Sequence, residues 1–111
     1  MEIYSGDLNS MVKEINEKAH EYMGEGLKVG IIASDETIDD YDLYYTSKNI
    51  ISMGSRWKLE SIATNIFNVL RKFDKLNVDI ILSEGVEEVK IGKAIMNRMK
   101  KAAGGNITYL K

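Results

Sequence analysis

The chain has 111 residues, of which 44% are hydrophobic and 29% charged, and its formal net charge is −2 at pH 7. This length and composition predict one globular domain over residues 1–111, and the small net charge gives no global positive field for nucleic acid or membranes. The absence of cysteine excludes disulfides, thiolate nucleophiles and cysteine-based zinc sites, and a single histidine excludes a histidine-rich metal cluster.

The chain begins with a predicted strand, a helix and a second strand. Residues 2–5 (EIYS) are a strand candidate, and Asp7 is placed to act as the N-cap of the following turn. Apolar residues at helical spacing predict a helix over residues 8–24. The continuous apolar run over residues 27–33 (LKVGIIA) is typical of a strand buried on both faces.

An acidic segment follows. Residues 34–42 (SDETIDDYD) predict a loop or a short helix, opened by Ser34 or Asp35 as its cap. The carboxylates lack the spacing of an EF-hand calcium loop, so we interpret the segment as a solvated helix start. Three tyrosines are candidates for an aromatic surface patch, although with the basic residues elsewhere they do not predict an RNA-binding platform: Tyr41, Tyr44 and Tyr45.

The second half continues the alternation. A strand is predicted over residues 49–53, the most strongly amphipathic helix over 58–77, a buried strand over 78–83, a helix over 91–103 and a last strand over 106–110. Strands that alternate with helices imply right-handed crossovers. The pattern therefore predicts a three-layer α/β/α sandwich, Rossmann-like, with about five mostly parallel strands.

Ligands of such sheets bind at the carboxyl ends of the strands. The loops there are short and polar, but none matches a P-loop or a dinucleotide-binding fingerprint. The G-S-R loop is the most suggestive, because the Ser55 hydroxyl and the Arg56 guanidinium could bind a small anion. Alternatively, Ser55 caps the next helix and Arg56 forms a surface salt bridge. Trp57 beside them either faces a partner or lies over the helix start.

One arginine lies on the apolar side of the last helix. Arg98 follows Ile91 by seven residues and so falls within the apolar arc, whereas Asn97 lies on the polar flank. A charge on a buried side costs several kcal/mol unless it is paired or its side chain reaches solvent, so Arg98 should have either a carboxylate partner or a docking surface. Glu84, at the end of the neighbouring strand, is the predicted carboxylate partner of Arg98.

Two further positions carry structural predictions. Arg71 and Asp74 lie three residues apart on the long helix and predict a structural ion pair. Gly92 lies inside the apolar arc of the last helix, where the missing side chain permits close approach of another backbone segment.

No catalytic set is visible. The sequence lacks a Ser-His-Asp combination and a plausible metal cage, so we predict no catalytic residue, metal ligand or cofactor for this chain. No apolar run approaches the ~20 residues of a membrane-spanning helix, and nothing resembles a signal peptide. We therefore expect a cytoplasmic protein that contacts no membrane.

Several motifs together resemble the C-terminal domain of the long, two-domain threonylcarbamoyl-AMP synthases. They lie in residues 54–85 and 92–105, and residues 6–17 and 28–36 also fit that domain's first helix and second strand. The motifs are G-S-R at Gly54, Ser55 and Arg56; L-R-x-x-D at Leu70, Arg71 and Asp74; E-G at Glu84 and Gly85; and G-x-A-x-x-N-R at Gly92, Ala94, Asn97 and Arg98.

The resemblance implies a pathway. Enzymes of this family use L-threonine, bicarbonate and ATP, with magnesium, to make threonylcarbamoyl-AMP and pyrophosphate. The product is the donor for threonylcarbamoyladenosine at position 37 of tRNA. That chemistry belongs to a YrdC-type catalytic domain, whose KxR and SxN elements are absent from this chain, as is the proline-rich linker. The resemblance thus implies that the chain alone makes no intermediate, and that ATP and magnesium serve the absent domain.

Two functions remain open at this point. The chain is either an accessory module that docks onto the catalytic domain in cis, or a small-molecule or nucleotide sensor that binds an anion at the strand ends. The candidate ligand- or interface-binding residues are Ser55, Arg56, Glu84, Asn97 and Arg98. A docking module should expose a contiguous apolar patch, whereas a sensor should have a concave polar pocket. Direct binding of nucleic acid is not expected.

Overall fold

The computed structural model describes residues 1–41 and 49–110. The strands in these ranges are β1 (Glu2–Ser5), β2 (Val29–Ala33), β3 (Asn49–Ser52), β4 (Ile80–Glu84) and β5 (Ile107–Tyr109). The helices are α1 (Leu8–Gly24), the 3-10 helix η1 (Ile38–Asp40), α2 (Leu59–Leu76) and α3 (Ile91–Ala102).

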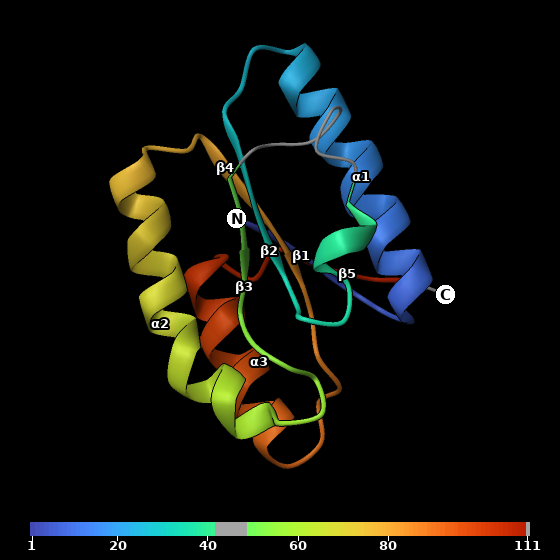
Figure 1. The fold of residues 1–111 in the computed structure, drawn as a ribbon, viewed down its shortest axis with the longest axis vertical. Coiled ribbons are helices and arrows are strands. Elements are labelled where there is room, and N and C mark those ends of the chain that lie inside the picture. Colours follow the sequence, from blue (N-terminus) through green and yellow to red (C-terminus); the bar gives the residue numbers. More distant parts are fainter. Residues whose placement is uncertain (42–48, 111) are drawn as a thin grey trace.

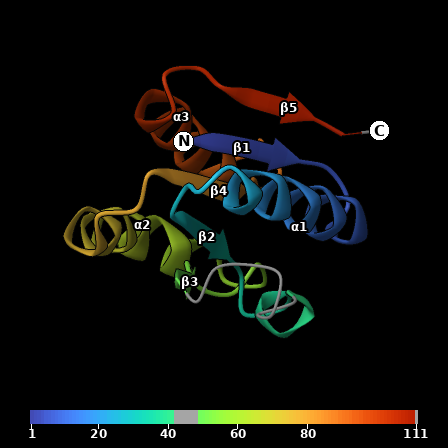
Figure 2. The same cartoon turned by 90° about the horizontal axis from the view of Figure 1, so that it is seen from above.

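The strands form one parallel sheet in the order β3-β2-β4-β1-β5. Helix α1 covers one face of the sheet, and α2 and α3 lie side by side on the other (Figures 1 and 2). The predicted three-layer sandwich is confirmed. None of the helices in the described ranges has the length and hydropathy that a membrane span requires.

Helix α1 begins where the sequence predicts. The carboxylate of Asp7 accepts the backbone N–H of Ser10 at 3.0 Å and the Ser10 hydroxyl at 2.8 Å, which satisfies one of the free N–H groups of the first turn. Met11, Ile15 and Ala19 are spaced four residues apart and are buried against the sheet. This stripe fixes α1 on the face formed by β1, β2 and β4.

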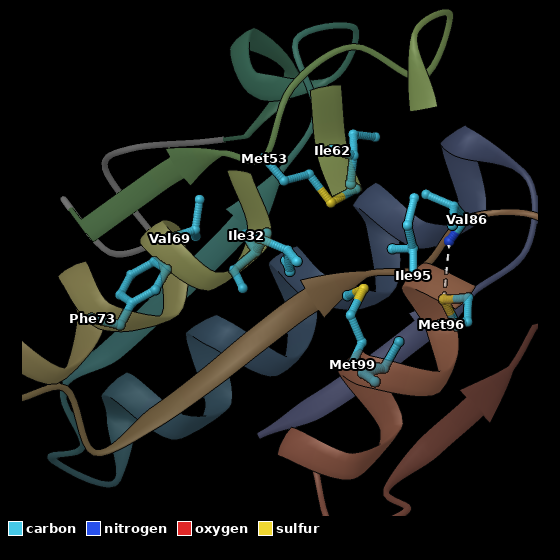
Figure 3. Packing of buried hydrophobic residues seen from close by; sticks show 11 residues of the cluster. Ile32, Met53, Ile62, Val69, Phe73, Val86, Ile95, Met96 and Met99 are labelled. Carbon is cyan, nitrogen blue, oxygen red and sulfur yellow. Dashed lines mark hydrogen bonds between the residues drawn. The ribbon is translucent and has the colours of Figure 1, made fainter. Parts of the chain in front are cut away.

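The opposite face holds the larger core. The predicted apolar side of helix α2 is buried against the sheet. Three residues of α3 join the same core cluster (Figure 3). The backbone N–H of Val86 donates to the sulfur of Met96 at 3.3 Å, which ties the loop after β4 to α3. Each fully buried aliphatic side chain here contributes about 1.5–3 kcal/mol. The buried helix residues are Ile62, Ile66, Val69, Phe73, Ile95, Met96 and Met99.

The acidic segment differs in detail from the prediction. A short helix forms, but it begins at Ile38, and Thr37 at its N-cap makes no side-chain capping bond. The Ser34 side chain does not cap this helix, because its hydroxyl donates to Glu84. Within residues 1–41 and 49–110, no three His, Cys, Asp or Glu side chains are grouped so that they could hold a metal ion. Asp42, Tyr44 and Tyr45 lie outside the described residues.

The carboxyl ends of the central strands gather at the lower end of the molecule in Figure 1. Backbone hydrogen bonds tie their loops together: Gly85 N–H donates to the Tyr4 carbonyl at 2.8 Å, and Asp35 N–H donates to the Gly54 carbonyl at 2.9 Å. Because β2 and β4 are neighbours in the sheet, the residues that follow β2 lie beside Glu84 at the end of β4.

Candidate functional site

A buried carboxylate lies at the centre of this end of the sheet. Glu84 is fully buried, and its Oε1 accepts the Ser34 hydroxyl at 3.0 Å and Nη2 of Arg56 at 2.7 Å. Its Oε2 accepts the hydroxyls of Thr37 and Tyr41, both at 2.5 Å. Four donors from two connections, three from the segment after β2 and one from the loop after β3, therefore converge on one side chain.

The network is complete within the chain. Burial raises the pKa of the Tyr41 hydroxyl, and the neighbouring Glu84 charge raises it further, so the phenol stays protonated and remains a donor. Among the described residues, no buried side-chain nitrogen or oxygen atom is without a hydrogen-bond partner. A buried carboxylate with a cation and three hydroxyl donors is a structural anchor, because every acceptor position already has a partner.

Arg56 is held from several directions. Its side chain is only 16% exposed. Besides the ion pair with Glu84, its Nε donates to the Ser34 hydroxyl oxygen at 3.1 Å. Its backbone N–H and the Ser55 hydroxyl each donate to one oxygen of Glu36 at 2.7 Å. Burial acts to raise the pKa of Glu36, but these two hydrogen bonds outweigh it and lower the pKa. Ser55 and Arg56 therefore lie at the predicted edge but bind the protein itself.

The residue after Arg56 points outward. Trp57 is 87% exposed and is flanked by two depressions of about 380 Å³ and 390 Å³, both lined also by Arg56, Leu59 and Glu87. The other apolar residues that line them come from α1, from the loop after β4 and from the start of α3. These side chains form an apolar surface, the Trp57 edge, made of the exposed Leu8, Trp57, Val89 and Ile91 and the half-buried Leu59.

The predicted pairing of Glu84 with Arg98 is wrong. Glu84 pairs with Arg56, and Arg98 is exposed, with its guanidinium carbon 5.3 Å from the centre of the Phe67 ring on α2. Asn97 is exposed beside it. The two motif positions on α3 therefore do not meet Ser55, Arg56 and Glu84 in one site.

Arg71 and Asp74 do not form the predicted ion pair. Both side chains are exposed on α2, and within the described ranges no contact of 4.0 Å or less joins their charged groups. An exposed pair three residues apart gains little in water, so side-chain entropy can outweigh the attraction. Arg71 instead lines a depression together with Lys72 and Lys75.

Replacing Arg98 with alanine tests whether Arg98 is exposed and unpaired with Glu84. Since the guanidinium is exposed and contacts an aromatic ring, Arg98→Ala should lower the free energy of unfolding by no more than about 1 kcal/mol. Urea denaturation followed by circular dichroism measures the change. A loss of several kcal/mol would show that Arg98 is a buried, paired charge after all.

Three residues of the anchor were not found from the sequence: Ser34, Thr37 and Tyr41. The sequence indicates their role only through position: Ser34 directly follows a fully buried strand, and the other two residues lie in the same segment. Hydroxyl residues are ordinary in such loops, and only the adjacency of β2 and β4 places them against Glu84.

Comparison with known proteins gives consistent matches. The family described as "Threonylcarbamoyl-AMP synthase, C-terminal domain" matches residues 4–104. The threonylcarbamoyl-AMP synthase of Pyrococcus abyssi is 36% identical over 105 residues, which are 95% of this chain and 28% of that protein. The chain thus spans little more than a quarter of that relative's length.

Solved structures agree with this. The crystal structure of P. abyssi Sua5 complexed with L-threonine superposes with a TM-score of 0.83 at 36% identity, over 99% of this chain and 30% of that one. The C-terminal Sua5 domain from Pyrococcus horikoshii superposes with a TM-score of 0.73 at 32% identity, over 97% of this chain and 93% of that one. The second match shows that a domain of this extent has been crystallised by itself.

Proposed function

This chain belongs to the family of threonylcarbamoyl-AMP synthase C-terminal domains, and we propose that it is an accessory domain that docks onto the catalytic domain of such an enzyme through the Trp57 edge. The exposure of Trp57 at an edge fixed by a buried ion pair is the observation that carries this proposal. The parent enzyme would convert L-threonine, bicarbonate and ATP, with magnesium, to threonylcarbamoyl-AMP for tRNA modification.

The remainder of a synthase is the natural occupant of this edge. The matching relative is more than three times as long as the matched segment, so in such a protein the domain has a partner in the same chain. Tryptophan is enriched among the residues that dominate binding energy at interfaces. Side chains such as Val89, which is 60% exposed, add apolar area around it. The edge therefore combines a tryptophan and exposed aliphatic side chains with charged side chains around them, as a docking surface with a polar rim does.

The anion-sensing alternative has weaker support. It requires Arg56 to present its guanidinium to a ligand, but Nη2 and Nε are bound to Glu84 and Ser34. The depression at the strand ends includes Ser5, Gly6 and Gly85, but the carboxylates of Asp7 and Glu87 also line it and disfavour an anion. The depressions beside Trp57 combine apolar side chains with Glu36, Glu60 and Glu87. A site of this composition suits a protein surface better than a small anion.

Docking would serve the chemistry by covering the catalytic cleft. An acyl adenylate is readily hydrolysed, and closing an active site excludes the water that would destroy such an intermediate. Closure of a lid or domain over bound substrate also commits the substrate to reaction. The Glu84–Arg56 pair would hold the Trp57 loop in one conformation, so that docking does not have to order it.

Calorimetric titration of this chain with the separately expressed catalytic domain tests the proposal. Trp57→Ala should weaken the affinity by about 2 kcal/mol, or about thirtyfold, because the side chain lies at the interface centre. Phe67→Ala is the matched control, since Phe67 is also an exposed aromatic but lies on α2 away from this edge. The chain has a single tryptophan, so its emission should also shift on docking.

The same titration with ATP–Mg, AMP, pyrophosphate and L-threonine tests the alternative. If this chain binds one of these ligands, and Arg56→Ala weakens that binding, the anion-sensing function is correct. Equal affinities of the wild-type chain and Trp57→Ala for the catalytic domain would place the interface elsewhere.

A further inference from the structure

The net charge of −2 conceals a separation of charge along the chain. Residues 1–42 contain 11 acidic and 3 basic residues, which is a net charge of −8. Residues 43–111 contain 6 acidic and 12 basic residues, which is a net charge of +6. Such asymmetry between two halves of a sequence suggests a partner of opposite charge for one of them.

The fold turns this asymmetry into two faces. Helices α1 and η1 belong to the acidic half and lie on one side of the sheet, whereas α2 and α3 belong to the basic half and lie on the other (Figures 1 and 2). Helix α3 contains four basic residues and no acidic one. Since the molecule measures 38 × 30 × 25 Å and charges are screened over about 8 Å at physiological salt, a ligand at one face feels mainly that face.

The cationic face consists of five exposed side chains that no described acid pairs: Arg71, Lys72, Lys75, Arg98 and Lys101. In contrast, Lys100 on α3 is paired with Glu88 at 2.6 Å. Two acids, Glu60 and Asp74, lie on α2 and reduce the positive charge, but neither lines the depressions described next. Five unpaired cations on two adjacent helices favour an anionic partner.

An aromatic ring lies among these cations. Between α2 and α3 a groove of about 450 Å³ is lined by Phe67, Leu70, Arg98 and Lys101, with Phe67 49% exposed beneath Arg98. On the other flank of α2, a second depression of about 450 Å³ combines cations with amides, which donate and accept hydrogen bonds: Asn65, Asn68, Arg71, Lys72 and Lys75.

We propose that the cationic face binds a single-stranded nucleic acid. Lysines and arginines would contact its phosphates, a base would stack on Phe67 beside Arg98, and the asparagines would hydrogen-bond to base edges or sugars. An anionic membrane could use the cations and Phe67, and an acidic protein helix could use the cations, but both would leave the asparagines on the other flank of α2 without a role. The expectation that the chain binds no nucleic acid rested on the total charge, which averages two faces of opposite sign.

Fluorescence anisotropy with labelled oligonucleotides of about 12 nucleotides tests the proposal, with uridine and thymidine oligomers to distinguish RNA from DNA. The affinity should fall steeply between about 50 and 200 mM salt. Lys72→Ala with Lys101→Ala should lower the slope of log affinity against log salt by about 1.4, because each lost phosphate contact removes about 0.7. Phe67→Ala should weaken binding at least about fivefold at unchanged slope.

Lys13→Ala with Lys18→Ala is the matched control, because it removes the same charge from α1. This variant should leave both the affinity and the slope unchanged. Absence of binding at low salt, or equal weakening by both double variants, would overturn the proposal. A further outcome would also overturn it. If sedimentation shows a salt-sensitive dimer of the wild-type chain that is lost in the Lys72/Lys101 double variant, the cationic face contacts a second copy of the chain instead of nucleic acid. None of these outcomes depends on the Trp57 edge, so the two proposals stand or fall separately.

Discussion

Replacement of Glu84 with glutamine is expected to lower the free energy of unfolding by about 3 kcal/mol. The substitution keeps the size of the side chain but removes the charge that compensates Arg56, and it places an amide donor among four donors. Removal of one partner of a buried ion pair costs about 3–5 kcal/mol. The lower end applies because Arg56 keeps some contact with solvent. Urea denaturation followed by circular dichroism measures the loss.

Glu88→Gln is the control for this prediction. Glu88 also pairs with a cation, Lys100 at 2.6 Å, but both side chains are 29% exposed, so its replacement should cost only a small fraction of the loss at Glu84. In a chain that already carries Arg56→Met, Glu84→Gln should cost less, because no buried cation remains unpaired. Equal losses from Glu84→Gln and Glu88→Gln would mean that the anchor is not buried.

The order of the elements could be predicted from the sequence because each one has a local signal. Every predicted strand and helix is present, with ends within a few residues, since apolar periodicity and a capping residue such as Asp7 act over one element at a time. The sheet order has no such local signal. It decides which loops meet, and therefore the partner of Glu84 could not be predicted from spacing alone.

Arg98 shows a second limit. The seven-residue spacing places Arg98 on the same side of α3 as Ile91, and the apolar Ile91 predicts that this side is buried. Ile91 is in fact 39% exposed, so this side of the apolar arc is a rim that faces solvent next to α2. A helical wheel gives the direction of a side chain but not the depth to which a neighbouring helix covers it. The cation therefore needs no buried carboxylate and instead lies over Phe67.

The charge of the two faces could have been predicted from the sequence. Counting charge over the whole chain gives −2, but counting it by halves separates α1 from α2 and α3. When crossover helices cover both faces of a sheet, the helices on one face can carry the opposite charge to those on the other, because the sheet and the two cores separate them. Charge counted separately over each predicted helix is therefore enough to indicate the cationic face.

Replacement of Gly92 with alanine should destabilise the domain by about 3 kcal/mol and should also weaken docking. A Cβ atom at this position would lie 1.9 Å from the carbonyl oxygen and 3.1 Å from the carbonyl carbon of Glu87. The obstacle is backbone, so the loop between β4 and α3 must move, and overpacking of this kind costs about 1–3 kcal/mol or more. Glu87 and Val89 in this loop line the depressions beside Trp57, so docking is disturbed as well.

Gly24→Ala separates this effect from that of glycine replacement in general. Gly24 is the last residue of α1, and no neighbouring atom lies within 4 Å of the place that a Cβ atom would occupy, so alanine there should be neutral or should stabilise by up to about 1 kcal/mol. Thermal and urea denaturation of both variants, together with calorimetric titration of the catalytic domain, give the comparison. If Gly92→Ala is as stable as Gly24→Ala and docks normally, the loop after β4 does not rest on α3, and the Trp57 edge is not the rigid surface that docking requires.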